Sequence, residues 1–285
     1  MSTEHGFERV MVAGAGTMGQ GIAQLCVEAG LPTLVYDVSP AMLHKAKTGI
    51  EAAWDVRVAK GKLNKSDAER FKSMLQYSDR SEDLRGDLLI EAVIESASVK
   101  RALFGTVEAQ NGPETVLASN TSSIPMEQLA EGLARPERVV GLHFFNPAPV
   151  MKLVEVITTP HTNTALFDTA WGFIQSIGKT PVHCQDTPGF IVNRVARPYY
   201  LEAMRVVESG KATPEMVDRI MESAGFKLGP FKLTDLIGQD INLAVSRSVY
   251  EQLNKPERLQ PSPLQEKLVE DGKLGRKTGE GFYRY

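Results

Sequence analysis

The segment at residues 10–37 constrains the fold of this chain more than any other part of the sequence. A strand-like apolar run at 10–13 leads into Gly14-Ala15-Gly16-Thr17-Met18-Gly19, which matches the pattern G-x-G-x-x-G, and a helical pattern follows at 18–29. A second strand-like run at 33–36 then leads directly into Asp37. Strand, glycine loop, helix, strand and acid in this order predict a parallel βαβ unit that binds a dinucleotide.

Each part of this unit has a physical reason to be there. Gly14 permits a tight turn, Gly16 lets the backbone approach a pyrophosphate, and Gly19 allows close contact between helix and strand. The amide groups at the helix N-terminus favour the negative charge of the phosphates. A carboxylate at Asp37 would accept hydrogen bonds from ribose hydroxyls and repel a 2′-phosphate, so the sequence predicts NAD rather than NADP. The alternative is a structural turn followed by an exposed aspartate.

Strand and helical patterns continue to alternate along the first two thirds of the chain. Helical patterns occur at 41–60, 66–75 and 99–109, and strand-like runs at 88–94, 116–119, 139–144 and 154–157. Such alternation is typical of a sheet of parallel strands with helices on both faces. We therefore expect a Rossmann-like, doubly wound sheet of the α/β class.

The strand patterns stop near residue 185. Thr187 and Pro188 form a helix-start pattern, in which threonine caps the helix and proline takes its first position. Helical patterns then run to residue 222 and again across 233–253, and Pro198 is expected to kink the first of them. We expect two domains, a Rossmann domain at 1–185 and an all-α C-terminal domain at 186–285.

Composition limits the partners and the compartment. The 285 residues contain 32 Lys+Arg against 35 Asp+Glu, a formal net charge of −3, so we expect neither a nucleic-acid partner nor a membrane partner. No apolar run approaches the ~20 residues of a membrane span, and the polar residues 1–9 do not match a signal or transit peptide. Cys26 and Cys184 offer neither a disulfide framework nor a zinc pattern. The expectation is a cytoplasmic protein without a metal site.

Of the five histidines, His143 is the one that the predicted fold places at a ligand-binding edge. It lies at the end of the strand-like run 139–144, and Glu155 interrupts the apolar run 153–157 after a loop rich in proline. If the chain turns at that loop, the two side chains meet, and the carboxylate would orient the imidazole and stabilise its protonated form. From the residues alone, an acid/base pair and a buried structural pair are equally good interpretations.

Two other polar positions are candidates for ligand contacts. The run Ser119-Asn120-Thr121-Ser122-Ser123 follows a strand that ends at the same edge, where short side chains can donate hydrogen bonds to a substrate or ribose oxygen. Such residues are more often ordinary helix caps. Asn193 lies in an apolar stretch near the start of the first C-terminal helix, where either a satisfied buried amide or an inward-facing ligand fits.

Taken together, these segments resemble the L-3-hydroxyacyl-CoA dehydrogenase family, particularly its short bacterial members that act on 3-hydroxybutyryl-CoA. The resemblance covers nearly the whole chain. Its most specific blocks are residues 141–157 and 186–194, whereas many dehydrogenases share the glycine motif. The other segments that carry it are Glu91-Ala92-Val93-Ile94-Glu95, Ser119–Ser123, Gly229-Pro230-Phe231 and residues 277–283.

The resemblance implies an NAD-dependent enzyme of fatty acid metabolism that interconverts (S)-3-hydroxyacyl-CoA and 3-ketoacyl-CoA, and a homodimer formed through the helical domain. It implies that His143 is the catalytic base, that Glu155 is its partner, and that Ser122 and Asn193 hold the substrate oxygen. Cofactor contacts are implied for the glycine motif, Asp37, Glu95, Lys100, Ser122, Asn146 and Lys277. The CoA phosphates would meet Lys60 or Lys62. The apolar residues that fit a dimer face are Phe190, Val195, Tyr199, Tyr200 and Val206.

The chain departs from the family pattern in two places. Ser96 and Ala97 stand where the family is expected to have asparagine and a bulkier residue, which affects the loop on the nicotinamide side. Ala53 stands where a serine of the CoA-binding helix is expected, and the cationic end of that helix is equally well explained as a solvated terminus.

Three alternatives to this assignment exist. Other Rossmann dehydrogenases of 3-hydroxy acids, such as the 3-hydroxyisobutyrate and 6-phosphogluconate enzymes, resemble one another in using a catalytic lysine. The lens lambda-crystallins resemble the family but are expected to differ where this chain has Phe144-Phe145. A module that senses NAD(H) without chemistry is the third. The block that contains His143 and Glu155 favours the acyl-CoA dehydrogenase over all three.

Overall fold

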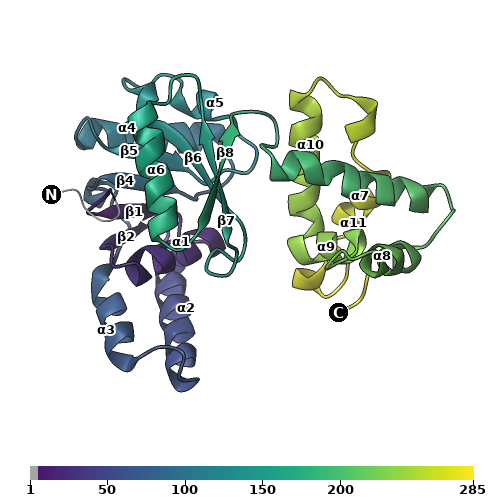
Figure 1. Ribbon diagram of the computed structural model, residues 1–285, viewed down its shortest axis with the longest axis horizontal. Coiled ribbons are helices and arrows are strands. Elements are labelled where there is room, and N and C mark those ends of the chain that lie inside the picture. Colours follow the sequence, from purple (N-terminus) through teal and green to yellow (C-terminus); the bar gives the residue numbers. More distant parts are fainter. Residues whose placement is uncertain (1–5) are drawn as a thin grey trace. The chain divides into compact units, whose positions relative to one another are not determined.

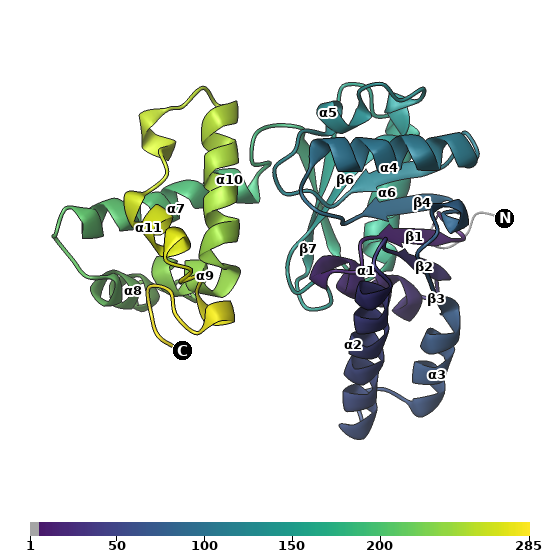
Figure 2. The same ribbon diagram turned by 180° about the vertical axis from the view of Figure 1, so that it is seen from behind.

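The protein is described from a computed structural model that covers residues 6–285, so the start of the polar segment 1–9 lies outside the described residues (Figure 1). The chain divides into two compact units after Asp186. The first unit contains a sheet with helices, and the second is helical (Figures 1 and 2). Within residues 6–285, no helix is long and apolar enough to cross a membrane.

Eight strands form a single sheet in the first unit. They are β1 (Val10–Ala13), β2 (Thr33–Tyr36), β3 (Leu75–Ser78), β4 (Leu88–Glu91), β5 (Val116–Ser119), β6 (Val139–Phe144), β7 (Leu153–Thr158) and β8 (Thr180–Gln185). Their order is β3-β2-β1-β4-β5-β6-β7-β8, and every neighbouring pair is parallel except β6 and β7. The predicted Rossmann-like α/β fold is confirmed.

Helices cover both faces of this sheet. They are α1 (Thr17–Glu28), α2 (Pro40–Ala59), α3 (Lys65–Met74), α4 (Ala97–Gln110), α5 (Met126–Ala130) and α6 (Thr164–Ser176), with short 3-10 helices η1 (Ser81–Asp83) and η2 (Pro136–Arg138). Figures 1 and 2 show α6 and α4 on opposite faces. Every residue of β1, β4, β5 and β6 is therefore buried, which explains why these strands read as continuous apolar runs rather than alternating ones.

The sequence did not single out β3, and it indicated β8 only by a strand end near Cys184; both strands lie at edges of the sheet. Only Pro181 and Cys184 are buried in β8, and only Leu75 is buried in β3. Edge strands of this kind contain few apolar residues, so they lack the signal that identified the central strands.

The second unit consists of α7 (Val192–Glu208), α8 (Pro214–Ser223), α9 (Pro230–Ile237), α10 (Gln239–Gln252) and α11 (Pro263–Glu270), with η3 (Glu257–Leu259) and η4 (Arg276–Thr278). The predicted helix start at Thr187 and Pro188 is wrong. Gly189 and Phe190 have φ values of +76° and +51°, which no α-helix accommodates, so α7 begins only at Val192. The predicted helix at 233–253 is likewise two helices, because Gly238 has φ +105°.

Two buried aspartates fasten the end of the chain within this unit. Asp218 accepts hydrogen bonds from the backbone amide of Phe231 and from the hydroxyl of Tyr283 at 2.9 and 2.8 Å. Asp235 accepts from the amides of Phe282 and Tyr283 at 3.0 and 2.9 Å. Burial, together with the bond to Asp218, raises the pKa of the Tyr283 phenol. The last residues are therefore held as part of the helical unit.

Candidate active site

The carboxyl ends of five parallel strands, β1, β2, β4, β5 and β6, lie at one edge of the sheet. The glycine motif follows β1, Asp37 follows β2, Glu95 follows β4, Ser122 follows β5, and His143 lies near the end of β6. In open α/β sheets this edge is where ligands bind. The first unit thus brings most of the predicted site residues to one place.

The glycine motif has the geometry of a dinucleotide loop. Gly14 has φ +104°, and a Cβ there would lie 2.4 Å from the carbonyl oxygen of Ala92. A Cβ on Gly19 would lie 1.8 Å from the carbonyl oxygen of Gly14, whereas one on Gly16 would meet no atom within 4 Å. The protein itself therefore requires the first and third glycines. The second leaves open space in front of the first turn of α1, where a phosphate would be favoured.

Asp37 links the glycine loop to the start of α2. Its carboxylate accepts hydrogen bonds from the amides of Ala15 and Ser39 at 2.8 and 2.9 Å. A cavity of about 710 Å³ adjoins it, and its walls contain the exposed apolar side chains of Val38 and Ile94. The remaining lining residues are Gly14, Gly16, Tyr36, Met42, Ser81, Ala92, Val93, Val99, Ala102, Leu103 and Thr106. A flat apolar ring in this cavity would place its ribose at Asp37, so these residues fit NAD.

Ala15, Thr17 and Met18, the other members of the motif, occupy the loop and the first turn of α1. Ala15 is buried, Thr17 is exposed and Met18 is half-buried. Met18 packs against the core of the first unit.

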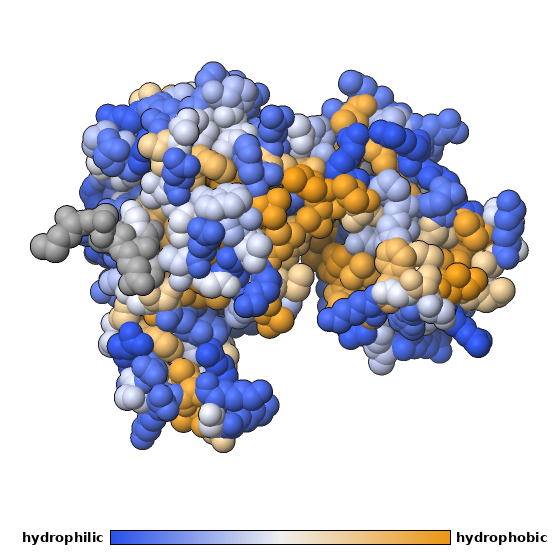
Figure 3. Space-filling view, viewed as in Figure 1, coloured by the Kyte–Doolittle hydropathy of each residue, from blue (hydrophilic) through white to orange (hydrophobic). Residues whose placement is uncertain are grey.

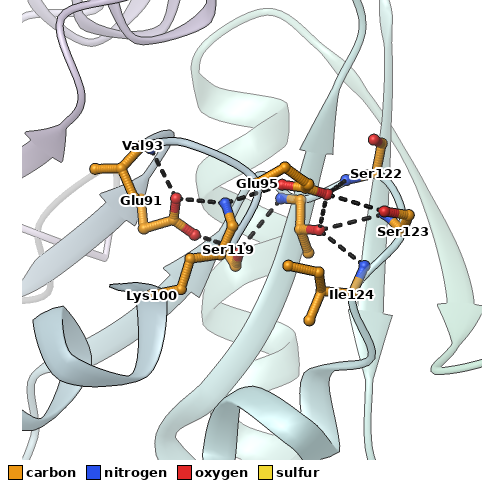
Figure 4. A network of polar contacts seen from close by, with 9 residues as sticks. Glu91, Val93, Glu95, Lys100, Ser119, Ser122, Ser123 and Ile124 are labelled. Carbon is orange, nitrogen blue, oxygen red and sulfur yellow. Dashed lines mark hydrogen bonds and ion pairs between the residues drawn. The ribbon is translucent and has the colours of Figure 1, made fainter. Parts of the chain in front are cut away.

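A lysine lies between two glutamates where β4 ends (Figure 4). The ammonium of Lys100 is 2.6 Å from Glu91 Oε1 and 3.1 Å from Glu95 Oε2. The side chains of Lys100 and Glu91 are 1% and 0% exposed, whereas Glu95 is 41% exposed. Glu91 also accepts from the hydroxyl of Ser119 at 2.6 Å. One cation therefore neutralises two carboxylates beside the sheet edge.

The two glutamates respond differently to this arrangement. Burial raises the pKa of Glu91, although Lys100 and Ser119 oppose that rise. Burial also disfavours ionised Glu95, but Lys100 together with the hydroxyls of Thr121 and Ser123 holds its pKa below the ordinary value. Glu95 is consequently the ionised acceptor that the network presents at its exposed side.

The residues after β5 are tied to this network. The Thr121 hydroxyl donates to Glu95 Oε1 at 2.5 Å, and the amide of Ser122 donates to the same oxygen at 3.2 Å. Thr121 also accepts from the amide of Ile124, as an ordinary cap would. Ser122 is half-buried on the turn that Glu95 holds (Figure 4). The two loops at the ends of β4 and β5 thus form one connected structure.

His143 and Glu155 face each other across the antiparallel strands β6 and β7. The two residues are direct partners in the register, and His143 Nδ1 lies 2.7 Å from Glu155 Oε2. His143 is 6% exposed and Glu155 is fully buried. Because the carboxylate engages Nδ1, Nε2 is the ring nitrogen that faces away from it. The ring of Phe145 lies against the imidazole, with centroids 4.6 Å apart.

The remaining predicted site residues lie in several places. Asn146 is exposed in the loop after β6, and Lys60 and Lys62 are exposed at the end of α2. In the second unit, Asn193 is half-buried at the start of α7. The ammonium of Lys277 pairs with Asp240 in that same unit, at 2.6 Å. Their proposed contacts with cofactor or substrate stay predictions.

Glu91 is a site residue that sequence reasoning missed. It lies in the quoted segment 91–95, and no role was assigned to it. A signal was available, because a charged residue at the end of an otherwise apolar strand must be paired when it is buried. Among residues 6–285, no cluster of three His, Cys, Asp or Glu side chains has the arrangement of a metal site.

Comparison with known protein families gives the same match along both units. Residues 9–187 match the family described as 3-hydroxyacyl-CoA dehydrogenase, NAD binding domain, and residues 189–285 match its C-terminal domain. Human mitochondrial hydroxyacyl-coenzyme A dehydrogenase is 42% identical over 287 residues, which cover 98% of this chain and 91% of that protein. The 3-hydroxybutyryl-CoA dehydrogenase of Mycobacterium tuberculosis is 38% identical over 98% of each.

The 3-hydroxyadipyl-CoA dehydrogenase of Escherichia coli is 46% identical over 97% of this chain, which spans only 58% of that longer relative. Among solved structures, 3-hydroxybutyryl-CoA dehydrogenase from Escherichia coli superposes with a TM-score of 0.94 at 46% identity, covering 98% of this chain and 59% of that one. (S)-3-Hydroxybutyryl-CoA dehydrogenase from Ralstonia eutropha superposes with a TM-score of 0.93 at 36% identity, covering 98% and 99%.

Proposed function

Because the chain belongs to the 3-hydroxyacyl-CoA dehydrogenase family, we propose that His143 and Glu155 perform the proton transfer of its reaction. The chain is an NAD-dependent oxidoreductase that interconverts 3-hydroxyacyl-CoA and 3-ketoacyl-CoA. The observation that supports the proposal is the 2.7 Å contact between a nearly buried imidazole and a fully buried carboxylate at the ligand edge of the sheet.

In this proposal each side chain has a defined task. His143 Nε2 accepts the proton of the 3-hydroxyl group during oxidation and returns it to the same oxygen during reduction. Glu155 accepts the Nδ1 proton, which fixes the orientation of the ring and stabilises the imidazolium that forms. Bound NAD supplies the chemistry of taking up or delivering a hydride at C3. Ser122 and Asn193 are proposed to hold the substrate oxygen.

The proposal extends to the cofactor and the acyl chain. Asp37 is proposed to accept the adenosine ribose hydroxyls, with Glu95, Lys100, Asn146 and Lys277 as further cofactor residues. Lys60 or Lys62, both exposed, is proposed to meet the CoA phosphates. The substrate is proposed to be the short-chain pair of (S)-3-hydroxybutyryl-CoA and acetoacetyl-CoA. The compartment is proposed to be the cytoplasm, where the buried thiols of Cys26 and Cys184 stay reduced.

The experiment that tests this assignment follows NADH absorbance after acetoacetyl-CoA is added, with NADPH in parallel. We expect NADH to be oxidised, and NADPH to react with kcat/KM lower by at least about fivefold, since two like charges at 4 Å repel by about 1 kcal/mol even in water. Equal rates with the two cofactors would contradict the role of Asp37. Activity only with longer 3-ketoacyl-CoA thioesters would contradict the short-chain assignment.

We also propose that two copies of this chain associate through the second unit. Apolar side chains gather on its face over α7 and α8 (Figure 3). On α8 only Asp218 is buried, while Met216 and Ile220 are 52% and 63% exposed; on α7, Val195 is 71% exposed. Exposed apolar side chains that gather on one face are typical of an interface. Phe190 and Tyr200, which the sequence assigned to the dimer face, are buried instead, and Tyr200 belongs to a core cluster of the unit.

A glutamate in this face should separate the two copies. We expect the wild-type protein to have twice the 31.3 kDa mass of one chain in light scattering, and Ile220→Glu to shift the mass toward 31.3 kDa, because association would bury the added charge. Val56→Glu, which places the same charge at an exposed apolar residue of α2, is the control and should keep the wild-type mass. A wild-type monomer would refute the dimer.

A further inference from the structure

A lysine outside the proposed catalytic residues fastens the loop between β6 and β7. The loop comprises residues 145–152 and joins the strand of His143 to the strand of Glu155. The ammonium of Lys179, which immediately precedes β8, donates three hydrogen bonds to backbone carbonyl oxygens of this loop. Its acceptors are Ala148 at 2.6 Å, Pro149 at 3.2 Å and Met151 at 2.9 Å.

The surroundings of Lys179 are unusual for a lysine. It is 7% exposed, and among the described residues no carboxylate lies within ion-pair distance of it. Burial, and then the like charge of Lys152, lower the pKa of Lys179, while Glu28 opposes them. The three N–H groups of an ammonium are matched by three carbonyl oxygens, so every donor is satisfied. An apolar side chain would avoid the cost of burying a charge but would leave three carbonyl groups without this donor.

The same loop also lies against the helix of the glycine motif. Gly21 belongs to α1, and a Cβ at this position would lie 2.9 Å from Pro149 Cδ and 3.0 Å from Ala148 Cβ. The helix and the loop are therefore in van der Waals contact with no room for another methyl group. The hydrogen bonds from Lys179 and the close contact at Gly21 together fix the loop relative to α1, whose first turn borders the proposed cofactor site.

Both ends of the loop lead directly to the proposed catalytic pair. At the first end, the Phe145 ring lies against the His143 imidazole with centroids 4.6 Å apart. At the other end, the carbonyl oxygen of Lys152 accepts from the amide of Thr180 at 2.8 Å, where β7 and β8 begin to pair. Asn146, a proposed cofactor residue, lies within the loop. A shift of the loop would therefore move Phe145, which lies against His143, and also Asn146, a proposed cofactor residue.

We propose that Lys179 is a positioning residue for hydride transfer. It holds the 145–152 loop against Gly21 of α1, so that the distance between the His143 imidazole and the cofactor site stays fixed. The inference rests on the proposed roles of His143 and Glu155. Lys179 is not among the residues proposed to contact the cofactor or the substrate. It acts through the loop. The close contact between the loop and Gly21 contributes to the same positioning.

Three variants of the full-length protein test this proposal. Lys179→Met keeps the length of the side chain and removes the three donors. Gly21→Ala keeps Lys179 and pushes the added methyl group against Ala148 and Pro149 of the loop, so it serves if Lys179→Met does not fold. Gly172→Ala is the matched control, because it is also a glycine inside a helix, and a Cβ there meets no atom within 4 Å.

Two measurements separate positioning from a general loss of folded protein. In the protein without cofactor, Lys179→Met should speed hydrogen exchange of the amides of Val150 and Met151, which donate to Pro147 at 3.0 Å. With acetoacetyl-CoA, kcat/KM should fall by about tenfold to 10²-fold, and the primary isotope effect with NADH deuterated at the transferred hydrogen should rise. Unfolded enzyme contributes no turnover, so it leaves the isotope effect unchanged.

The outcomes distinguish this inference from the assignment on which it rests. Raised isotope effects in Lys179→Met and Gly21→Ala, with a wild-type value in Gly172→Ala, would support it. If His143→Gln abolishes turnover while both loop variants keep the wild-type isotope effect, Lys179 is structural only and the inference is overturned. If His143→Gln retains full turnover, the proposed roles of His143 and Glu155 fail, and the inference fails with them.

Discussion

Replacing His143 by glutamine should lower kcat for the reduction of acetoacetyl-CoA by about 10²–10⁴-fold. Glutamine is polar and close to histidine in size, so the fold of the β6–β7 pair should persist, but the side chain has no group that exchanges a proton near neutral pH. NADH binding should change little, because the glycine motif and Asp37 lie on other strands. The measurements are steady-state turnover and the fluorescence of bound NADH.

His183→Gln provides the matched control for that variant. His183 lies on β8 in the same sheet, and its Nε2 is 2.8 Å from the Thr158 hydroxyl, so it too is a hydrogen-bonded histidine. It lies away from the ligand edge residues, and its substitution should leave kcat within about twofold of wild type, as expected of a surface substitution. A His143→Gln enzyme with more than a tenth of wild-type turnover would contradict the acid/base assignment.

Removing the cation between Glu91 and Glu95 should produce the largest loss of stability among these variants. Lys100→Met leaves the fully buried Glu91 without its ionic partner, and breaking a buried pair in this way costs about 3–5 kcal/mol of unfolding free energy. The two tryptophans, Trp54 and Trp171, both belong to the first unit. Urea unfolding followed by tryptophan fluorescence therefore reports on the unit that contains the substitution.

The double variant Glu91→Gln with Lys100→Met tests the cause of that loss. Removing both charges avoids an unpaired buried carboxylate, so much of the lost stability should return. Lys72→Met is the comparison for a lysine with two carboxylate partners, Asp55 and Glu69, that are themselves largely exposed, and it should shift the midpoint far less. If Lys100→Met lowers the free energy of unfolding by less than about 1 kcal/mol, the buried Glu91 does not need its ionic partner for stability.

The central strands and the glycine loop could be predicted because their signals are local. Strands β1 and β4 are buried on both faces and read as unbroken apolar runs, and Gly14 and Gly19 occupy positions that only glycine can fill. The position of His143 at the ligand edge followed from the same strand pattern. His143 lies close to Glu155 because β6 and β7 pair. The proline loop indicated that the chain turns there, and the register shows that the two residues are direct partners.

Features that depend on contacts between distant segments could not be read in this way. Lys100 looks like an ordinary helix lysine, and only the structure shows that it lies between the buried carboxylate of Glu91 and the partly exposed one of Glu95. Phe190 and Tyr200 match a helical apolar pattern, but the pattern does not say which apolar residues face inward. The start of α7 was misplaced because the left-handed backbone at Gly189 and Phe190 outweighs the cap and proline before them.

The direct pairing of His143 with Glu155 in an antiparallel ladder has a consequence for how this site tolerates change. Side chains on a strand alternate between faces, so a slip of one residue between β6 and β7 would send the carboxylate to the opposite face of the sheet, and a slip of two would carry it past the imidazole. The backbone hydrogen bonds between β6 and β7 therefore determine whether the two side chains meet. Variation in length has to be absorbed within residues 145–152, where the chain is not in the ladder, rather than within either strand.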